Sequence, residues 1–469
     1  MFYAKKTLKY MRKMLIAAML LASCFLPAKG EDYSAYYKDL PVKLQQVNVP
    51  NIPDRRVNIT DFGAKGDGLT DCTEALQKAI DAVAEQGGGH VDVDAGIWVF
   101  SPIVMKSGVD LHLARHCLLQ LSEDRYKSVK PGARKASYGI GGTDLHDISI
   151  TGEGIIDGNG EFWRYVKRSK QSDVEWKEYL AMGGTLNDKG DMWFPFNLRH
   201  QANIAADMMK QEKMRADLVR FDRCQRVMLK GITLQNSPRF HFRPGDCSDI
   251  IVDGISVWCP WNAQNGDGID IGHGKRVLIV GNTVDCGDDG ICMKGGAGEA
   301  SVGHSANEDI LITNNTVYHA HGGFVIGSDL SAGMKNIVVC HNTYSNTDTG
   351  LRFKSAVGRG GVTQNIYCYD IVMTNIKNEA IIFETTYHDT AVAAGKDGWG
   401  GEKWVPDFKD IHISNITCNS CKTAIKSDTS GGMVHDIEVN NSVFFYTKTG
   451  TDIDKGSDIK MNNVTLKTY

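Results

Sequence analysis

The sequence lacks the features that mark three classes of protein. It contains only 11 prolines in 469 residues, with 42% hydrophobic and 23% charged residues, which is typical of a folded protein rather than a disordered chain. The formal net charge is -4 and no lysine and arginine run follows residue 13, which excludes the charge pattern of a nucleic-acid-binding protein. No stretch after residue 30 approaches the ~20 apolar residues of a membrane span. These absences indicate a large folded protein with neither a nucleic-acid partner nor a membrane span.

Cysteine is present, but without the spacing of a disulfide framework. The chain has 12 cysteines, and removal of Cys24 with a leader would leave an odd, dispersed set that lies within apolar alternations. We expect most of them to be buried apolar residues. Cys418 and Cys421 form a C-x-x-C motif, but no second pair or histidine cluster lies near it in the sequence, so we expect a structural role there too.

The amino-terminal residues have the order of a secretory signal peptide. Five basic residues up to Lys13 precede an apolar run, and a small-x-small pattern ends at Gly30. This predicts cleavage after residue 30, a single domain over residues 31–469, and a periplasmic or extracellular location. The segment "LASC" ends at Cys24 and also matches a lipoprotein cleavage box, so a lipid anchor on Cys24 is the alternative.

A short phrase with alternating apolar residues recurs along the chain. From the second instance, at 226, onwards, successive starts lie 22 to 45 residues apart, with the shortest interval from 436 to 458 and the longest from 365 to 410. Short strands closed by Asn or Gly turns at such intervals predict an all-β solenoid, a right-handed parallel β-helix. The instances are "DISITG" at 147, "RVMLKG" at 226, "DIIVDG" at 249, "RVLIVG" at 276, "DILITN" at 309, "NIVVCH" at 336, "NIYCYD" at 365, "DIHISN" at 410, "DIEVNN" at 436 and "DIKMNN" at 458.

Other segments depart from the repeat. Residues 72–85 have helical apolar spacing and end before three glycines, which predicts a helix that caps the amino-terminal end of the solenoid. Two interruptions, at about 161–215 and 387–408, are expected to be long surface loops, the first with a helix over 205–219.

Charged residues recur at the same interval as the coils. Asp267 precedes Asp288 by 21 residues, and Asp289 precedes His321 by 32. Arg352 follows His321 by 31 residues, and Lys354 is two residues further along, so these two side chains point the same way. Stacked coils would therefore bring Asp267, the aspartate pair, His321 and the two cations close together.

This combination predicts acid catalysis on an acidic substrate. Crowding of Asp267, Asp288 and Asp289 raises the pKa of at least one of them, which keeps a proton available for a leaving oxygen. Carboxylates on adjacent coils approach the separation of ~6.5–9.5 Å that an inverting glycosidase needs. Arg352 and Lys354 suit a substrate carboxylate. Taken singly, an Asp-Asp turn or a lone histidine is more often structural, so the prediction depends on their common register.

The same segments resemble glycoside hydrolase family 28, the polygalacturonase family, in its bacterial exo-acting form. The resemblance extends over nearly all of residues 31–469 and is specific because the landmarks occur in order. They are "VNITDFGAKGDGLTDCTEALQKAID", "TGEGIIDGNGEFW", "GITLQNSPRFHFRPGDCSDI", "NGDGIDI", "GDDGICMKGG", "HGGFVIGS" and "GLRFKSAVGRGG".

The resemblance implies roles for individual residues. Asp288 is similar to the general acid, and Asp267 and Asp289 to the pair that activates water; no metal or other cofactor is implied. Arg352 and Lys354 match the pair that binds the substrate carboxylate. Tyr387 resembles the tyrosine that contacts the substrate. The family's Asn-Thr-Asp reads Asn265-Gly266-Asp267 here, and its histidine aligns with Gly322, which places His321 one residue away.

We therefore expect an inverting hydrolase of α-1,4-galacturonosyl bonds in pectin, acting from chain ends. A rhamnogalacturonan or other pectic oligosaccharide hydrolase is the first alternative. A Ca²⁺-dependent pectate lyase and a non-catalytic glycan-binding β-helix are further alternatives. The oligomeric state is left open.

Overall fold

The structure is a computed structural model that describes residues 31–123, 138–195, 215–296, 298, 301, 307–387 and 404–469. The predicted leader with Cys24 lies outside these residues, as does most of the second interruption, so the cleavage site and the lipid anchor stay predictions. The chain divides into two compact units, one up to Asp39 and one from Leu40. In the first unit the described residues form the short 3-10 helix η2 (Ser34–Tyr37), and Tyr33 donates a hydrogen bond to Glu31 (2.7 Å).

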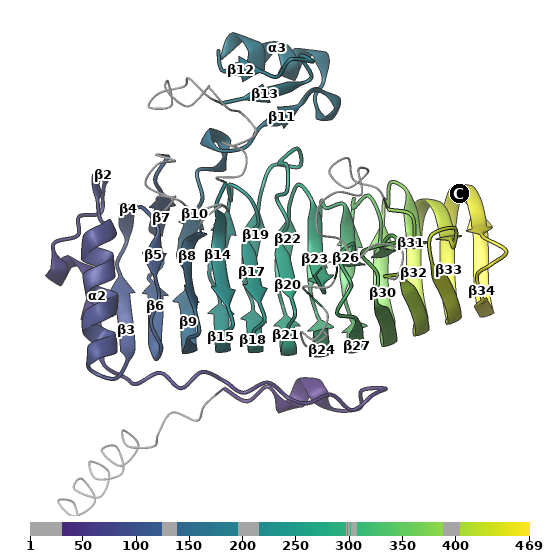
Figure 1. Ribbon diagram of the computed structural model, residues 1–469, viewed down its shortest axis with the longest axis horizontal. Coiled ribbons are helices and arrows are strands. Elements are labelled where there is room, and N and C mark those ends of the chain that lie inside the picture. The colour runs from purple at the N-terminus through teal and green to yellow at the C-terminus, as the bar shows by residue number, and fades with distance from the viewer. Residues whose placement is uncertain are drawn as a thin grey trace, which may run out of the picture. The chain divides into compact units, whose positions relative to one another are not determined.

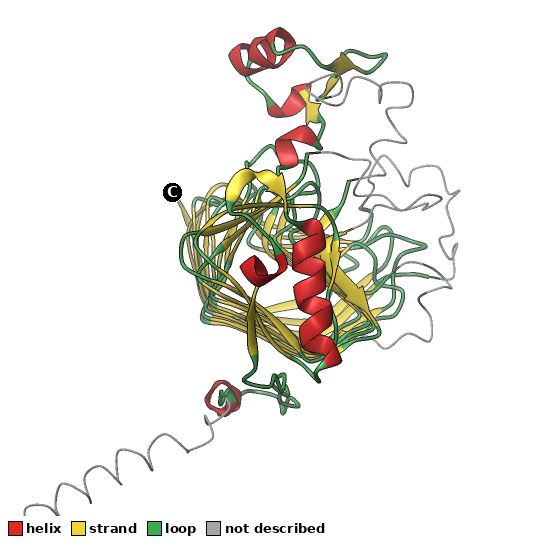
Figure 2. Cartoon of the chain, turned by 90° about the vertical axis from the view of Figure 1, so that its left-hand side faces the viewer, coloured by secondary structure: helices red, strands yellow, loops and turns green. Residues whose placement is uncertain are grey.

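The second unit is the predicted right-handed parallel β-helix. Three strands follow one another in most coils, and each pairs in parallel with the strand at the same place in the next coil (Figure 1). The strands therefore form three columns, which Figure 2 shows nearly end-on. In the last coils the strands are longer, and one strand extends over two columns. Strand β30 also pairs with β28, and β32 also pairs with β31.

The columns run in chain order. The first contains β1 (Arg56–Asn58), β3 (Gly89–Val93), β6 (Val109–Leu113), β9 (His146–Gly152), β15 (Gln225–Lys230), β18 (Ser248–Asp253), β21 (Lys275–Val280), β24 (Asn307–Thr313), β27 (Met334–Cys340), β30 (Val362–Thr374), β32 (Asp407–Asp428), β33 (Met433–Ile453) and β34 (Ile459–Thr468). The second contains β2 (Asp67–Asp71), β4 (Gly96–Phe100), β7 (Cys117–Leu121), β10 (Ile155–Asp157), β16 (Thr233–Gln235), β19 (Ser256–Trp258), β22 (Thr283–Asp285), β25 (Thr316–Val317) and β28 (Thr343–Ser345). The third contains β5 (Ile103–Val104), β8 (Tyr138–Thr143), β14 (Asp217–Asp222), β17 (Phe242–Gly245), β20 (Ile269–Gly272), β23 (Asp289–Lys294), β26 (Gly322–Gly327), β29 (Leu351–Lys354) and β31 (Glu379–Glu384).

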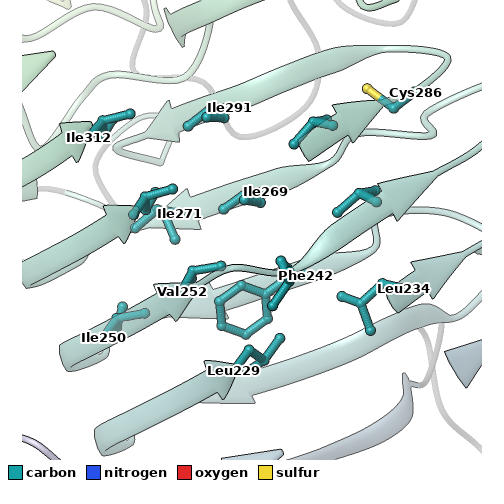
Figure 3. Close-up of a cluster of buried hydrophobic side chains, with 14 of the residues drawn as sticks. Leu229, Leu234, Phe242, Ile250, Val252, Ile269, Ile271, Cys286, Ile291 and Ile312 are labelled. Carbon is teal, nitrogen blue, oxygen red and sulfur yellow. The ribbon is translucent and has the colours of Figure 1, made fainter. Parts of the chain in front are cut away.

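Every repeated phrase lies on a strand of the first column. Its alternating apolar residues point into the coil, so that Ile250 pairs with Val227 on one side and Val277 on the other. Each coil buries its apolar face only against its neighbours, which is why the strands stack at ~4.8 Å along the axis. Figure 3 shows this interior, where Phe242, Ile269 and Ile291 follow one another from successive coils.

A column of charged residues occupies the second position of four of these strands, next to the turn that precedes each strand. We call Asp147, Arg226, Asp249 and Arg276 the turn column; each occupies the first position of a phrase and has a positive φ near 55°. Arg226 binds both carboxylate oxygens of Asp147 (2.6 and 2.7 Å), and Arg276 binds those of Asp249 (2.8 and 2.7 Å). Stacking of the coils therefore places an aspartate next to an arginine at this position.

The predicted amino-terminal cap is confirmed. Helix α2 (Thr73–Glu85) buries Leu76, Ile80 and Val83 and packs against β3 at the first coil (Figure 1). The 3-10 helix η3 (Ile59–Phe62) packs against it. An apolar helical face there covers interior side chains that have no coil before them.

The first interruption is more ordered than a long loop. It contains the 3-10 helices η5 (Gly160–Phe162) and η6 (Arg168–Lys170), helix α3 (Asp173–Ala181) and a three-stranded antiparallel sheet. Its strands are β11 (Val166–Lys167), β12 (Thr185–Leu186) and β13 (Met192–Phe194). A capping box, with Ser172 at the N-cap and Glu175 at N3, starts α3 and is a signal in the sequence that the loop prediction overlooked. The helix predicted over 205–219 is wrong in its described part, because β14 begins at Asp217 and pairs with β8 and β17.

The cysteines behave as expected. All 11 cysteines among the described residues are free and buried, including Cys418 and Cys421. Along the same described ranges, no helix combines the length and apolar content needed to cross a membrane.

Candidate active site

Four of the predicted residues lie at the amino-terminal ends of strands in the third column. Asp267 lies two residues before β20, Asp288 directly precedes β23, and Asp289 is its first residue. His321 directly precedes β26. The register pairs Ile269 with Ile291, and Asp289 with Gly322, so equivalent positions lie one coil apart. We call Asp267, Asp288 and Asp289 the acid cluster.

Glycine allows the turns of the acid cluster to approach one another. A Cβ atom on Gly287 would lie 2.5 Å from the carbonyl oxygen of Ala263, and one on Gly290 would lie 2.7 Å from Cγ1 of Val317. Any other residue would force these coils apart. The glycines on either side of the aspartate pair are thus explained by close packing between coils.

Asp288 is joined to His321 and, through it, to the insert. Its Oδ1 lies 3.0 Å from Nδ1 of His321, while the side chains of Asp288 and His321 are 13% and 30% exposed. Lys170, the last residue of η6, has its Nζ 3.4 Å from Nε2 of His321 and donates to the carbonyl of Gly287 (3.3 Å). A positive charge from the insert therefore reaches the histidine on the side away from Asp288.

The other two carboxylates are buried against lysines. Lys354 binds both oxygens of Asp289 (2.8 and 3.1 Å), and both side chains are almost fully buried. Lys294 lies 3.4 Å from Asp267 and 3.3 Å from Asp270. One oxygen of Asp267 is buried and has no hydrogen-bond partner among the residues that the structure describes. The acid cluster thus contains more negative charge than its direct partners satisfy.

These surroundings separate the pKa values of the three aspartates. Burial, followed by the charge of Asp288, raises the pKa of Asp267 well above its ordinary value. Burial also acts to raise the pKa of Asp288, but the charge and hydrogen bond of His321, with Lys354, outweigh it and leave that pKa lowered. At Asp289 burial likewise acts to raise the pKa, but the charge of Lys354 acts to lower it, and the pKa of Asp289 is lowered overall. The pKa of Asp267 is thus raised, as crowding predicts for one member of the acid cluster, whereas that of Asp288, the residue expected to act as the acid, is lowered.

The predicted substrate-binding residues form a second group nearby. Arg352 and Lys354 lie on β29, and their charged ends are 5.4 and 4.9 Å from the ring centre of Tyr387. Arg352 also lies 3.3 Å from Glu384, and within the described part of the chain its buried Nε has no hydrogen-bond partner. The structure thus brings all seven predicted site residues onto neighbouring coils.

Residues beyond these seven also contribute. Lys294 contacts the acid cluster, and Asp270 pairs with Lys294. His319 does not join the cluster, because it lies 3.2 Å from Asp285 instead. His241 is buried, which lowers its pKa to about 4, and its Nδ1 lies 2.8 Å from the carbonyl of Asp267. Lys170 had no sequence signal, because it belongs to the insert and not to the repeat.

A cavity of about 980 Å³ lies between the insert and the turns that precede the third column. Its lining includes the aromatic side chains of Tyr165, Trp193 and Trp258 and the carboxylates of Glu161 and Asp285. None of the seven predicted residues lines it. The candidate catalytic residues are therefore those of the acid cluster and not those that line this cavity.

The donor set near the acid cluster suits a proton better than a calcium ion. Asp288, Asp289 and His321 each offer one ligand atom, and these three atoms lie within 4.8 Å of one another. Calcium takes six to eight oxygen ligands, however, and one of these donors is nitrogen. The ammonium groups of Lys170 and Lys354 also oppose a cation here. The expectation of a metal-free site stays a prediction.

Comparison with known proteins adds an independent result. Residues 174–468 match Glycosyl hydrolases family 28, and residues 56–112 match Rhamnogalacturonase A/epimerase, pectate lyase-like. An exo-poly-α-D-galacturonosidase of Dickeya chrysanthemi is 28% identical over 437 residues, which cover 87% of this chain and 70% of that protein. An endo-polygalacturonase of Pectobacterium carotovorum subsp. carotovorum is 26% identical over 416 residues, with coverage of 86% and 89%. The crystal structure of a hyperthermoactive exopolygalacturonase from Thermotoga maritima aligns with a TM-score of 0.73 at 27% identity, covering 90% of this chain and 94% of that one.

Proposed function

Because the chain belongs to glycosyl hydrolases family 28, we propose that it hydrolyses the α-1,4 bonds of polygalacturonate, with inversion and from chain ends. The observation that carries the proposal is the acid cluster beside Arg352, Lys354 and Tyr387. Carboxylates with separated pKa values supply acid and base. The adjacent cations supply the contact with a galacturonate carboxylate.

The distribution of charge suggests how the proton is used. The raised pKa of Asp267 favours this carboxyl as the one that holds the proton in the free protein, while Lys354 compensates Asp289. A substrate carboxylate that binds Arg352 and Lys354 takes over this positive charge and adds a negative one near Asp288. Both effects raise the pKa of Asp288, so that the proton moves to it from Asp267.

Hydrolysis then returns the site to its starting state. Asp288 gives its proton to the leaving glycosidic oxygen, and the C–O bond breaks. Asp267, now ionised and aided by Asp289, takes a proton from the water that attacks the anomeric carbon from the opposite face. The new C–O bond forms with inverted configuration. Asp267 is protonated again and Asp288 ionised, so the cycle needs no further proton.

The insert supports action from chain ends. Lys170 reaches from η6 to His321 and Gly287, so the insert lies against one side of the acid cluster. A long chain would have to pass this side to be cut internally. The names of the relatives include both exo- and endo-acting enzymes, so the contact made by Lys170 is the observation that favours the exo mode.

Product analysis on polygalacturonate tests the proposal. We expect saturated monogalacturonate from the first time points, with the β-anomer formed first, and no change when a chelator is added. Mixed oligomers at early times would contradict the exo mode. Unsaturated, chelator-sensitive products would indicate a lyase. Release of products only from rhamnogalacturonan fragments would move the substrate to that alternative.

We also propose that the protein is exported, because its first 30 residues have the order of a signal peptide. Mass spectrometry of the protein purified from a bacterial host should give a mature chain that begins at Glu31. A diacylglycerol-modified chain that begins at Cys24 would instead support the lipid anchor. A chain that retains Met1 would contradict export.

A further inference from the structure

A second group of cations lies on the opposite side of the acid cluster from Arg352. The guanidinium groups of Arg239 and Arg243 lie 4.5 and 5.2 Å from the ring centre of Phe240, and Nζ of Lys294 lies 5.7 Å from it. Phe240 itself is buried. Three positively charged side chains therefore lie around the ring of Phe240.

Arg239 is the member of this group without a direct partner. Among the described residues, its guanidinium makes no hydrogen bond or ion pair, whereas Arg243 lies 3.6 Å from Asp217. Burial, together with the charges of Arg243 and Arg215, lowers the pKa of Arg239, although Asp217 and Asp267 oppose this. A half-buried, unpaired guanidinium costs free energy that a bound anion would recover.

The register places this group one coil before the acid cluster. Phe242 on β17 pairs with Ile269 on β20, two residues after Asp267. Arg215 joins the two turns, because it donates to the carbonyls of Pro238 (3.0 Å) and Gln264 (2.7 Å) and to Asn265. The turn that carries Arg239 is thus held beside the turn that carries Asp267.

The two sides of the acid cluster have the same composition. On the far side, Arg352, Lys354 and Arg359 lie 5.4, 4.9 and 5.9 Å from the ring centre of Tyr387. Each side therefore has three cations around one aromatic ring, and the carboxylates lie between them. A substrate that carries a carboxylate on both sides of the cleaved bond matches this arrangement.

We propose that Arg239, supported by Arg243, binds the carboxylate of the galacturonate residue on the side of the cleaved bond opposite to Arg352 and Lys354. This deepens the proposed function and rests on it. Arginine binds a carboxylate through two parallel hydrogen bonds, and its pairing with the substrate replaces its lost hydration. A neutral or methyl-esterified residue would leave Arg239 unpaired, so the site selects uronate on both sides.

The experiment uses digalacturonate and its two singly reduced forms, in each of which one carboxylate is replaced by a hydroxymethyl group. For Arg239→Met we expect kcat/KM to fall about 10²-fold on digalacturonate and on one reduced form. On the other reduced form, which lacks the carboxylate bound by Arg239, the variant should equal the intact protein. Arg352→Met should show the opposite pattern between the two reduced forms.

Two further variants control the measurement. Arg223→Met removes an exposed arginine that binds Asp144 away from the site and should leave all three substrates unchanged. Arg239→Lys keeps the charge without the paired hydrogen bonds, and should recover part of the activity on digalacturonate. It also serves as the test protein if Arg239→Met does not fold. Equal losses for the Arg239 variants on all three substrates would overturn the proposal.

Binding to Asp288→Asn separates this proposal from the proposed function. That protein should bind digalacturonate more tightly than either reduced form, and the added Arg239→Met change should abolish one of the two differences. If the intact protein hydrolyses no galacturonan while this binding pattern is found, the proposed function fails and the carboxylate site stands. Binding that is indifferent to Arg239 would overturn the site.

Discussion

Asp147 and Asp249 of the turn column each lie against an arginine of the next coil, whereas Asp267 of the acid cluster lies near other aspartates. The same parallel stacking produces both arrangements. At Asp147 the hydrogen bond from Arg226 is the largest influence and lowers the pKa. At Asp267 burial and Asp288 raise it. Stacking in register therefore brings equivalent positions together, and the residue types at those positions decide whether they attract or repel.

The comparison also separates stability from catalysis. Paired charges at the turn column hold coils together and leave no group free to exchange a proton. In the acid cluster, burial and the repulsion between carboxylates raise the pKa of Asp267. The following variants test this separation, from the largest expected effect to the smallest.

Asp288→Asn should have the largest effect. The variant cannot donate a proton to the leaving oxygen, so kcat on polygalacturonate should fall by about 10³-fold or more. The midpoint of thermal unfolding should change little, because the amide still reaches His321. Asp144→Asn, at an exposed carboxylate, is the matched control and should keep full activity. More than a tenth of the activity in Asp288→Asn would contradict its role as the acid.

Lys354→Met should reduce kcat/KM by about 10²-fold, because it removes a contact with the substrate and the partner of Asp289. Lys354 opposes the effect of burial on Asp289, so its loss raises the pKa of that carboxyl. Asp289 acts in its ionised form, and the acidic limb of the pH profile of kcat/KM should therefore move to higher pH. Lys335→Met, which breaks a surface pair with Glu308, should leave the profile unchanged. A smaller kcat/KM with an unshifted acidic limb would leave Lys354 as a substrate contact only.

Arg226→Met should change stability and not activity. It leaves Asp147 without its bidentate partner, and the free energy of unfolding at pH 7 should fall by about 1–3 kcal/mol. The folded protein lowers the pKa of Asp147, so this stabilisation is present above the ordinary value of about 4 and is lost as the pH falls further. Denaturant unfolding at pH 7 and at pH 3 measures the difference, which should shrink in acid. An equal difference at both pH values would argue against the ion pair as its source.

Asp267→Asn should have the smallest effect on stability, and in the opposite direction. The pKa of Asp267 is raised on folding, so the folded protein retains a proton that the unfolded chain releases above about pH 4. The cost grows above that pH, and its removal should raise the midpoint of unfolding at pH 7 by about 1–3 °C. No difference is expected below pH 4. The variant should be inactive, and a lower midpoint at pH 7 would contradict the assignment of the proton.

Much of the fold was readable in the sequence because a β-helix makes local repetition visible. Each phrase supplies one strand, and the strand that it pairs with lies one coil away, as from "RVMLKG" to "DIIVDG". The interval between Asp267, Asp288 and His321 therefore predicted their proximity. The insert was misjudged, since α3 and the small sheet follow no repeat and depend on their own capping and pairing.

By itself, the sequence predicted the parallel coils, the cap and six residues of the predicted site, because hydrogen bonding between successive coils converts spacing along the chain into position in space. Tyr387 was predicted from the resemblance to the family and not from spacing. Only the tertiary structure decided that the pKa of Asp267 is raised, that Lys170 reaches His321, and that Arg239 has no ion-pair partner among the described residues. The physical reason is that the energy of a charge depends on its burial and on the distances to every other charge. Those distances join an insert and coils that are far apart in the sequence.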